Sequence, residues 1–323
     1  MWKTHFATRK TSLKAHGISK ISPMKVFTKK ETPVQNLAFC AIIAGFDGIL
    51  SLVSAFLPLS AFFLMLIAPL LSALIGYFCQ KRYYAVYLFG ALGVSIAVSA
   101  WNFENTLFYL LPALCSGTAY GFFLRRKTNV VATNFVVAMI QYSFFWLSLL
   151  LVKGIYEVDM REIIRTALSL KTSDLLYDSF ALFALAYSFA VTGLSHLFFS
   201  LQAPHIGIAF EEKKKAEIWY PIIGIVSGLF CVLFTFIYAK LAYFFLGCAF
   251  YWALAGLISR FPKPHWSLYL LLGVTVFGSV LLIAYLFQNI SGSKAILTFI
   301  AFPLSLSLSS LPDVFLGLKK KSN

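Results

Sequence analysis

The 323-residue chain is 60% hydrophobic and only 12% charged, and its mean hydropathy is +0.82. A soluble domain carries about 25% charged residues, so this chain lacks the polar side chains needed to cover a water-facing surface. Its formal charge of +15 does not indicate nucleic-acid binding, because the basic residues gather between apolar runs, as they do where they set membrane topology. The lipid bilayer is therefore the expected partner.

The first 33 residues form a basic segment. Eight of the 27 Lys and Arg residues lie here, and no acidic residue occurs before Glu31. The segment is rich in Lys rather than Arg, and the apolar run that follows is too long for the core of a cleaved signal peptide. We interpret residues 1–33 as a retained cytoplasmic tail.

A membrane-spanning helix needs about 20 mostly apolar residues, and several runs of this kind follow the basic tail. In chain order they are 34–56, 59–79, 83–101, 105–124, 129–152, 178–200, 219–238, 241–259, 266–287 and 295–314. One helix covering all of 219–259 would overshoot the bilayer about twofold, so we predict a tight hairpin around Lys240. The sequence therefore predicts an all-α fold, a polytopic transmembrane bundle of about ten helices.

Basic clusters follow every second apolar run, whereas the other connections are nearly neutral. The clusters are Lys81-Arg82, Arg125-Arg126-Lys127, Lys213-Lys214-Lys215, Arg260 with Lys263, and Lys319-Lys320-Lys321. Because basic loops stay on the cytoplasmic side, this alternation predicts that both termini are cytoplasmic.

The spans divide into a six-span unit at 34–200 and a four-span extension with a basic tail at 219–323, joined by a cytoplasmic linker at 201–218. Between Asp159 and Leu170 the apolar residues share one helical face, which predicts a short amphipathic helix on the outer surface. This helix either caps an outward-facing cavity or is a plain interfacial connector. Prolines are expected inside three of the spans, where they kink helices: Pro69, Pro112 and Pro303.

Asp47 is the principal candidate for a functional side chain. It lies about 20 Å into the first apolar run at the helical rise. An ionisable group at that depth costs roughly 2.5–3.5 kcal/mol to insert, so it should face the bundle interior and have a partner. It predicts a proton or cation site or an acceptor for a polar solute; the alternative is a hydrogen-bonded acid that locks helices together.

Other polar and small residues at membrane depth extend this hypothesis. Gln141 and Tyr142 in the fifth run are further candidate ligand contacts, although interhelical hydrogen bonding is the more usual role of such residues. Two small-x-x-x-small stripes in the first run predict close packing against a partner helix, either within the bundle or in another subunit. These stripes consist of Ala41, Ala44, Gly45 and Gly48.

No enzymatic motif is present, and we expect neither catalytic residues nor a cofactor. The chain has no H-E-x-x-H, G-x-G-x-x-G or Walker A element, so it carries no ATPase. Its five cysteines form no C-x-x-C pair and indicate packing residues rather than a metal site. Ser116 and His196 could suggest a nucleophile and base, but their predicted depths differ by about 10 Å, beyond hydrogen-bond reach.

Three stretches resemble the YybS-type family of bacterial membrane proteins. They are L-P-L-S-A-F-F-L-M-L-I-A-P-L at 57–70, Y-W-A-L-A-G-L-I-S-R-F-P-K-P at 251–264, and S-S-L-P-D-V-F-L-G-L-K-K-K at 309–321. This resemblance implies a multi-pass protein of the bacterial inner membrane.

The six runs within 34–200 are also similar to the substrate-binding S component of energy-coupling factor vitamin transporters. That resemblance implies a small-molecule solute bound from outside and a membrane coupling subunit docked on the small-residue face of the first helix. We therefore expect a solute-binding or transport-associated subunit without its own ATPase. The alternative is a non-transporting membrane scaffold or envelope assembly factor.

Overall fold

The computed structural model describes residues 27–57, 61–157, 159, 162, 174–206, 208, 219–258 and 296–309. The predicted span 266–287, the basic clusters at 213–215, 260–263 and 319–321, and most of the predicted amphipathic segment lie outside these residues. Within the described part of the chain, every regular element is helical.

The remaining predicted spans each correspond to one helix. The helices are α1 (Pro33–Phe56), α2 (Ala61–Phe78), α3 (Tyr84–Val98), α4 (Phe103–Arg125), α5 (Val130–Tyr156), α7 (Asp174–Gln202), α8 (Trp219–Thr235), α9 (Ala239–Ile258) and α11 (Ile296–Ser309). Pro69, Pro112 and Pro303 lie inside α2, α4 and α11, as predicted.

Among the described residues, five helical segments are long and apolar enough to cross a membrane: Pro33–Phe56, Thr106–Arg125, Val130–Ile155, Phe180–Ile206 and Ala239–Leu257. Shorter apolar segments occur in α2, α8 and α11. These helices are compatible with an integral membrane protein.

The prediction of two helices within 219–259 is confirmed, but the break is not at Lys240. The chain turns at Phe236–Tyr238, and Lys240 is already the second residue of α9. The turn contains neither Gly nor Pro, so the charge of Lys240 was the only cue to its position in the sequence.

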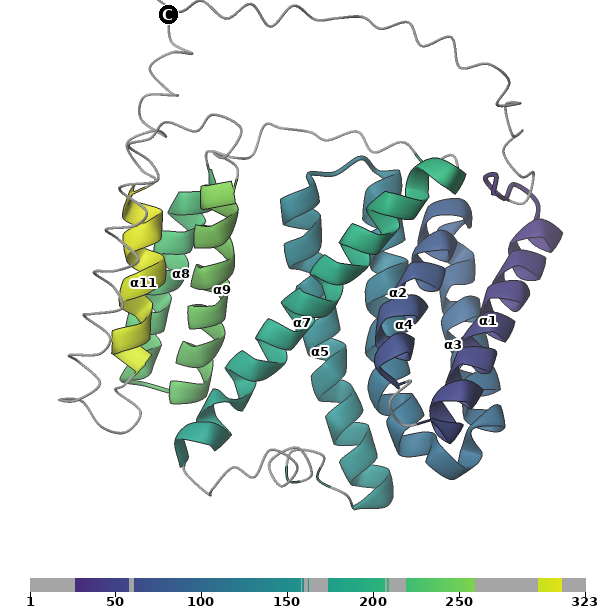
Figure 1. Ribbon diagram of the computed structural model, residues 1–323, viewed down its shortest axis with the longest axis horizontal. Coiled ribbons are helices and arrows are strands. Elements are labelled where there is room, and N and C mark those ends of the chain that lie inside the picture. Colours follow the sequence, from purple (N-terminus) through teal and green to yellow (C-terminus); the bar gives the residue numbers. More distant parts are fainter. Residues whose placement is uncertain are drawn as a thin grey trace, which may run out of the picture.

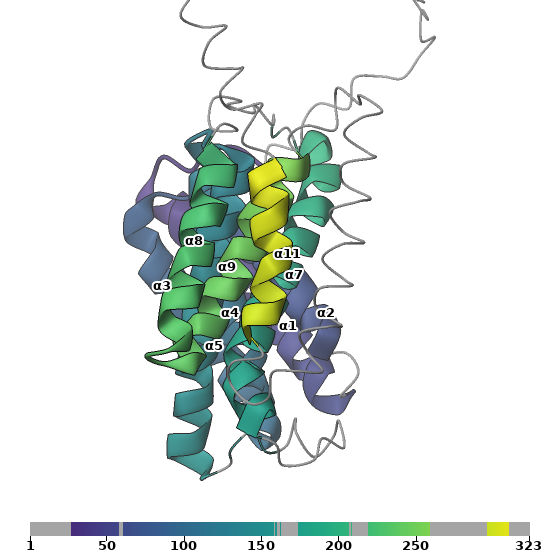
Figure 2. The same cartoon turned by 90° about the vertical axis from the view of Figure 1, so that its left-hand side faces the viewer.

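The helices form two groups joined by a diagonal helix (Figure 1). Helices α1 to α5 lie together on one side, and α8, α9 and α11 pack against one another on the other. Helix α7 crosses between them and packs on α5 and α2 in the first group and on α9 in the second. The turned view shows α8, α9 and α11 running along the long direction of the bundle (Figure 2).

Helices α2 and α4 make the closest approach in the first group. Gly117 and Gly121 on α4 are one turn apart, and a Cβ at either position would collide with the backbone of α2, at Pro69 and Ala73 respectively. A Cβ at Gly76 on α2 would likewise collide with the Thr118 carbonyl of α4. Small residues at this spacing let two backbones meet in a membrane, so these three glycines fix the α2–α4 interface.

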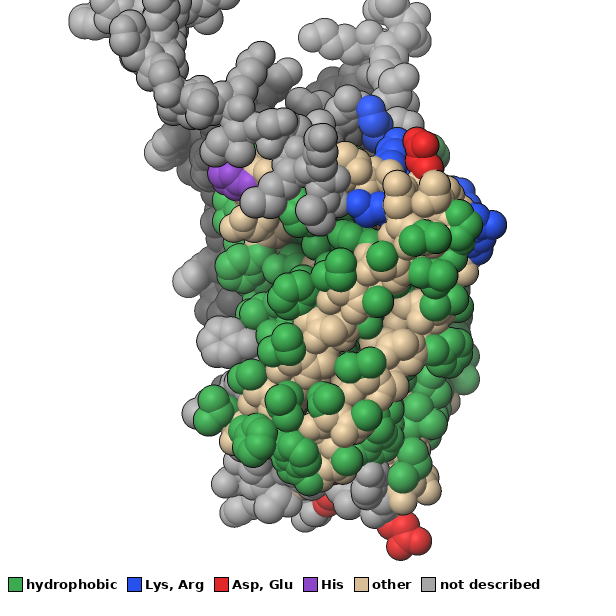
Figure 3. Space-filling model, turned by 90° about the vertical axis from the view of Figure 1, so that its right-hand side faces the viewer, with side chains coloured by type: hydrophobic (Ala, Val, Ile, Leu, Met, Phe, Trp, Pro, Cys, Tyr) green, Lys and Arg blue, Asp and Glu red, His purple; other side chains and the backbone are tan. Residues whose placement is uncertain are grey.

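The outer surface of the α1 side is apolar over most of its height, and Lys and Arg gather at one end (Figure 3). Large hydrophobic side chains of α1 point outward, with Val34 75% and Phe56 68% exposed. Because water disfavours such a surface, it indicates contact with the lipid bilayer.

Candidate functional site

Asp47 lies on the inward face of α1, where it meets α2 and α3. Its side chain is fully buried, and its Oδ2 accepts a hydrogen bond of 2.6 Å from the Tyr87 hydroxyl of α3. The Tyr87 hydroxyl is also 2.9 Å from Ser72 Oγ of α2, which bonds the Ala68 carbonyl at 2.8 Å. The predicted partner of Asp47 is therefore a tyrosine linked to a serine, and three helices share one polar chain.

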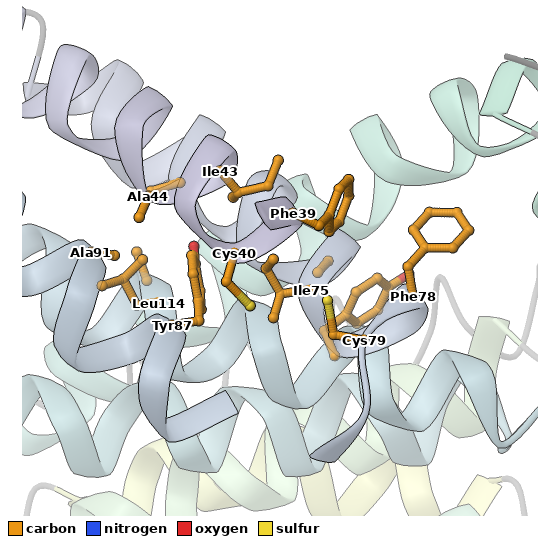
Figure 4. Packing of buried hydrophobic residues seen from close by; sticks show 14 of the residues in the cluster. Phe39, Cys40, Ile43, Ala44, Ile75, Phe78, Cys79, Tyr87, Ala91 and Leu114 are labelled. Atoms are coloured by element: carbon orange, nitrogen blue, oxygen red, sulfur yellow. The ribbon is translucent and has the colours of Figure 1, made fainter. Parts of the chain in front are cut away.

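The ring of Tyr87 lies in an otherwise hydrophobic cluster. Figure 4 shows it beside Cys40 of α1 and Ala91 of α3 and below Ala44 of α1, all of them buried. Hydrogen bonds in such a low-dielectric setting are stronger, and an unpaired polar atom there is correspondingly costly.

The α1–α3 interface continues beyond Asp47 as a row of buried hydroxyl groups. The members are Ser51 and Ser54 on α1, Ser95 and Ser99 at the end of α3, and Thr106 on α4. Ser51 Oγ donates to the Asp47 carbonyl at 2.8 Å, and Ser99 Oγ is 2.7 Å from Thr106 Oγ1. Buried hydroxyl groups therefore follow Asp47 toward the C-terminal end of α3, which is the end away from Lys81 and Arg82.

Two oxygen atoms in this interface have no hydrogen-bond partner among the described residues: Oδ1 of Asp47 and Oγ of Ser95. Buried polar atoms are nearly always paired. An unpaired carboxylate oxygen buried at this depth therefore indicates a place where a cation, a proton or a donor group can bind.

The other two predicted ligand contacts lie elsewhere. Gln141 on α5 is 1% exposed, and its Oε1 has no partner within the described structure. The Tyr142 ring packs against Trp146 and against Phe244 of α9. The side-chain partner of Asp47 is Tyr87 of α3, which in turn bonds Ser72 of α2, whereas α5 packs mainly on α4 and α7. The structure therefore does not bring the three residues together.

The predicted small-residue stripes face two directions. Ala44 and Gly48 are buried, and a Cβ on Gly48 would lie 2.7 Å from Val94 Cγ1 of α3. Ala41 and Gly45 are exposed, and nothing lies within 4 Å of a Cβ built on Gly45. The first pair closes the α1–α3 contact within the bundle, and the second pair is left at the outer surface.

A small, mostly apolar pocket of about 10 Å³ lies between α2, α4, α5 and α7. Its walls include the hydroxyl-bearing residues Ser116, Tyr120, Thr192 and Ser195. Ser195 is 8% exposed, and its Oγ has no partner in the described part of the chain. About this volume holds one water molecule.

Ser116 and His196 lie near this pocket but have other partners. Ser116 Oγ donates to the Ala113 carbonyl at 3.3 Å, and His196 Nδ1 is 2.6 Å from the Tyr120 hydroxyl. A catalytic serine needs its hydroxyl hydrogen directed at a base, whereas here it points to the backbone of its own helix.

Sequence reasoning missed Tyr87, Ser72 and Ser95. Serine and tyrosine are frequent in apolar helices, so none stands out alone. A usable signal is the helical spacing of Tyr87, Ala91 and Ser95, which places them on one face of α3.

Groups of three His, Cys, Asp or Glu side chains able to hold a metal ion do not occur among the described residues. The chain matches no protein-family model, and comparisons with curated proteins and with solved structures found no match either.

Proposed function

We propose that this protein is a solute-binding or transport-associated subunit of the bacterial inner membrane, with about ten spans and both termini in the cytoplasm. The apolar helices support the membrane location, and the alternating basic clusters support the orientation. Because the sequence has no nucleotide-binding motif, a separate subunit would supply any coupling to ATP.

The observation that carries this proposal is the buried Asp47 carboxyl group with one unpaired oxygen. Its Oδ2 is held by Tyr87, while Oδ1 has no partner among the described residues. A buried acid is expensive in a membrane and is typical of ion pathways and proton relays. Its expected ligand is a proton, a monovalent cation or a hydrogen-bond donor of a small solute.

The hydroxyl chain beside Asp47 can serve both ionisation states of the acid. When Asp47 is ionised, Tyr87 donates to Oδ2 and Ser72 can donate to Tyr87. When Asp47 is protonated, it can donate to Tyr87, Tyr87 to Ser72, and Ser72 to the Ala68 carbonyl, where a 2.8 Å bond lies. The chain can therefore reverse direction without moving a helix, which suits a site that gains and loses a proton or cation.

The resemblance to S components extends the proposal to a coupling subunit. Ala44 and Gly48 are occupied by the packing of α1 within the bundle, so Ala41 and Gly45 are the small residues left for a partner helix. We place the contact with a coupling subunit on that outer face of α1.

The test uses full-length protein purified in a neutral detergent. Mass spectrometry of the released small molecules would reveal a retained solute, and thermal unfolding in sodium chloride against choline chloride would reveal a bound cation. We expect at least one signal in the wild type and its loss in Asp47→Asn, which keeps the shape of the side chain but removes its charge. The absence of both signals from folded wild-type protein would overturn the proposal.

A scaffold role is the second candidate, and the dense packing around Asp47 favours it. A Cβ added at Gly48 would lie only 2.7 Å from Val94 Cγ1, and the hydrogen bond from Tyr87 to Asp47 is short, at 2.6 Å. In that case Asp47→Asn lowers the melting temperature, and neither a solute nor a cation changes it in the wild type.

A further inference from the structure

The basic end of the bundle holds two cations on one aromatic ring. Lys81 follows α2, and Arg126 follows α4. The Lys81 Nζ atom lies 4.9 Å from the centroid of the Phe122 ring, and the Arg126 Cζ atom lies 4.4 Å from it. Because cations are attracted to aromatic faces, the ring of Phe122 brings side chains from two separate connections together.

The ends of α2 and α4 are also fixed to each other. Arg125 Nη1 donates to the Cys79 carbonyl at 2.8 Å, which anchors the start of one basic connection to the other. The Tyr84 ring meets Phe122 edge-on at 6.5 Å, and the Tyr84 hydroxyl donates to the Gly76 carbonyl at 2.7 Å. The ring that holds the two cations is therefore built into the helix packing.

Two like charges held near one ring create a local positive potential, which attracts anions. The two charged groups lie 4.9 Å and 4.4 Å from the same ring centroid. Both side chains are exposed, and neither forms an ion pair with a carboxylate among the described residues. The pair thus presents unneutralised positive charge where the apolar helices end.

We propose that Lys81, Arg126 and the Phe122 ring bind the phosphodiester group of an anionic phospholipid. Basic pockets at the ends of membrane helices are the usual sites of anionic headgroups, and the adjoining apolar helix surface can take the acyl chains. Arg82, whose guanidinium lies 5.0 Å from the Tyr83 ring, adds positive charge beside the site. This inference rests only on insertion into a bilayer and is independent of any role of Asp47.

The test is lipid binding by the full-length protein in a neutral detergent, measured by native mass spectrometry. The probes are dioleoyl phosphatidylglycerol, dioleoyl phosphatidylcholine and inorganic phosphate. We expect the wild type to prefer phosphatidylglycerol and Lys81→Gln/Arg126→Gln to bind it about 30-fold more weakly, which is about 2 kcal/mol for two basic residues. The charge-matched control is Lys153→Gln/Lys240→Gln. It removes one cation from the last turn of α5 and one from the start of α9, away from Lys81 and Arg126.

Retention of the phosphatidylglycerol preference by the Lys81 and Arg126 variant would overturn the proposal. An equal loss in the control variant would also overturn it, because net charge rather than this site would then set lipid binding. If inorganic phosphate displaces phosphatidylglycerol from the wild type at comparable concentration, the site is a phosphate site and not a lipid site. Unchanged circular dichroism of both variants shows that these substitutions leave the fold intact.

Discussion

The Tyr87 hydroxyl donates a hydrogen bond of 2.6 Å to Oδ2 of Asp47, and this contact joins α3 to α1 inside the bundle. Tyr87 is among the largest fully buried side chains, and its hydroxyl also reaches Ser72 on α2. One phenol group thus links three helices that are separate in the sequence. The fold and the candidate site both depend on it.

Tyr87→Phe should destabilise the protein, because it leaves Oδ2 of Asp47 buried without its donor. Loss of one partner of a buried polar group costs about 1–3 kcal/mol, with the upper end applying to charged groups. A lower melting temperature in detergent checks this. Tyr84→Phe is the matched control, since the Tyr84 hydroxyl is only partly buried and donates to a backbone carbonyl. Equal effects of the two variants would contradict a special role for the Tyr87–Asp47 bond.

Asp47→Asn should lower the free energy of unfolding less in the Tyr87→Phe background than in the wild type, because the two side chains share one hydrogen bond. Residues in direct hydrogen-bond contact show coupling of about 0.5–3 kcal/mol in double-mutant cycles. Thermal unfolding of the wild type, both single variants and the double variant gives the coupling energy. Additive changes would show that the 2.6 Å contact contributes little to stability.

Hydropathy and charge pattern predicted the helices well. The predicted spans agree with α1 to α5 and α7 to within a few residues, because helix length in a membrane is set by apolar length and by the charges at its ends. The buried position of Asp47 also followed from the cost of placing a carboxyl group in lipid. Its partners did not, because which helices are neighbours depends on packing between distant segments.

The small residues show the same limit. The spacing of Ala41, Ala44, Gly45 and Gly48 predicts close packing but does not say which side of the helix faces the bundle. The tightest contact is instead made by Gly117 and Gly121 of α4, at the same G-x-x-x-G spacing. Sequence spacing cannot rank such stripes, because close contact also requires a matching surface on the facing helix.

Gly121→Ala should therefore destabilise the protein strongly, because the new methyl group would collide with the Ala73 carbonyl of α2. Helix α2 would have to move, and overpacking of this kind costs about 1–3 kcal/mol or more. Gly45→Ala is the matched control at the exposed outer face of α1. It meets nothing within 4 Å and gains helix propensity of up to about 1 kcal/mol. A higher melting temperature for Gly121→Ala than for Gly45→Ala would contradict the described α2–α4 interface.

Asn36 of α1 fastens the segment before α1 to the loop after α2. It is fully buried; its Nδ2 donates to the Lys30 and Thr32 carbonyls at 3.3 and 2.8 Å, and its Oδ1 accepts from Gln80 N at 2.8 Å. Asn36→Leu keeps a side chain of similar shape but removes the acceptor of the Gln80 amide, whereas the Thr32 carbonyl keeps its bond from the Asn36 amide.

We expect faster amide hydrogen exchange at Gln80 in Asn36→Leu, together with a loss of roughly 1–3 kcal/mol of stability, because the part-buried Gln80 amide loses its acceptor. Gln35→Ala is the neighbouring control, since it removes only the exposed Gln35 side-chain oxygen that accepts from the Glu31 and Thr32 amides, and it leaves the Thr32 cap in place. It should cost at most about 1 kcal/mol. Faster exchange at Gln80 in the Gln35 variant, but not in the Asn36 variant, would show that capping rather than Asn36 holds the loop. The opposite result would place the anchor of the basic end in a single buried amide, next to the connection that carries Lys81.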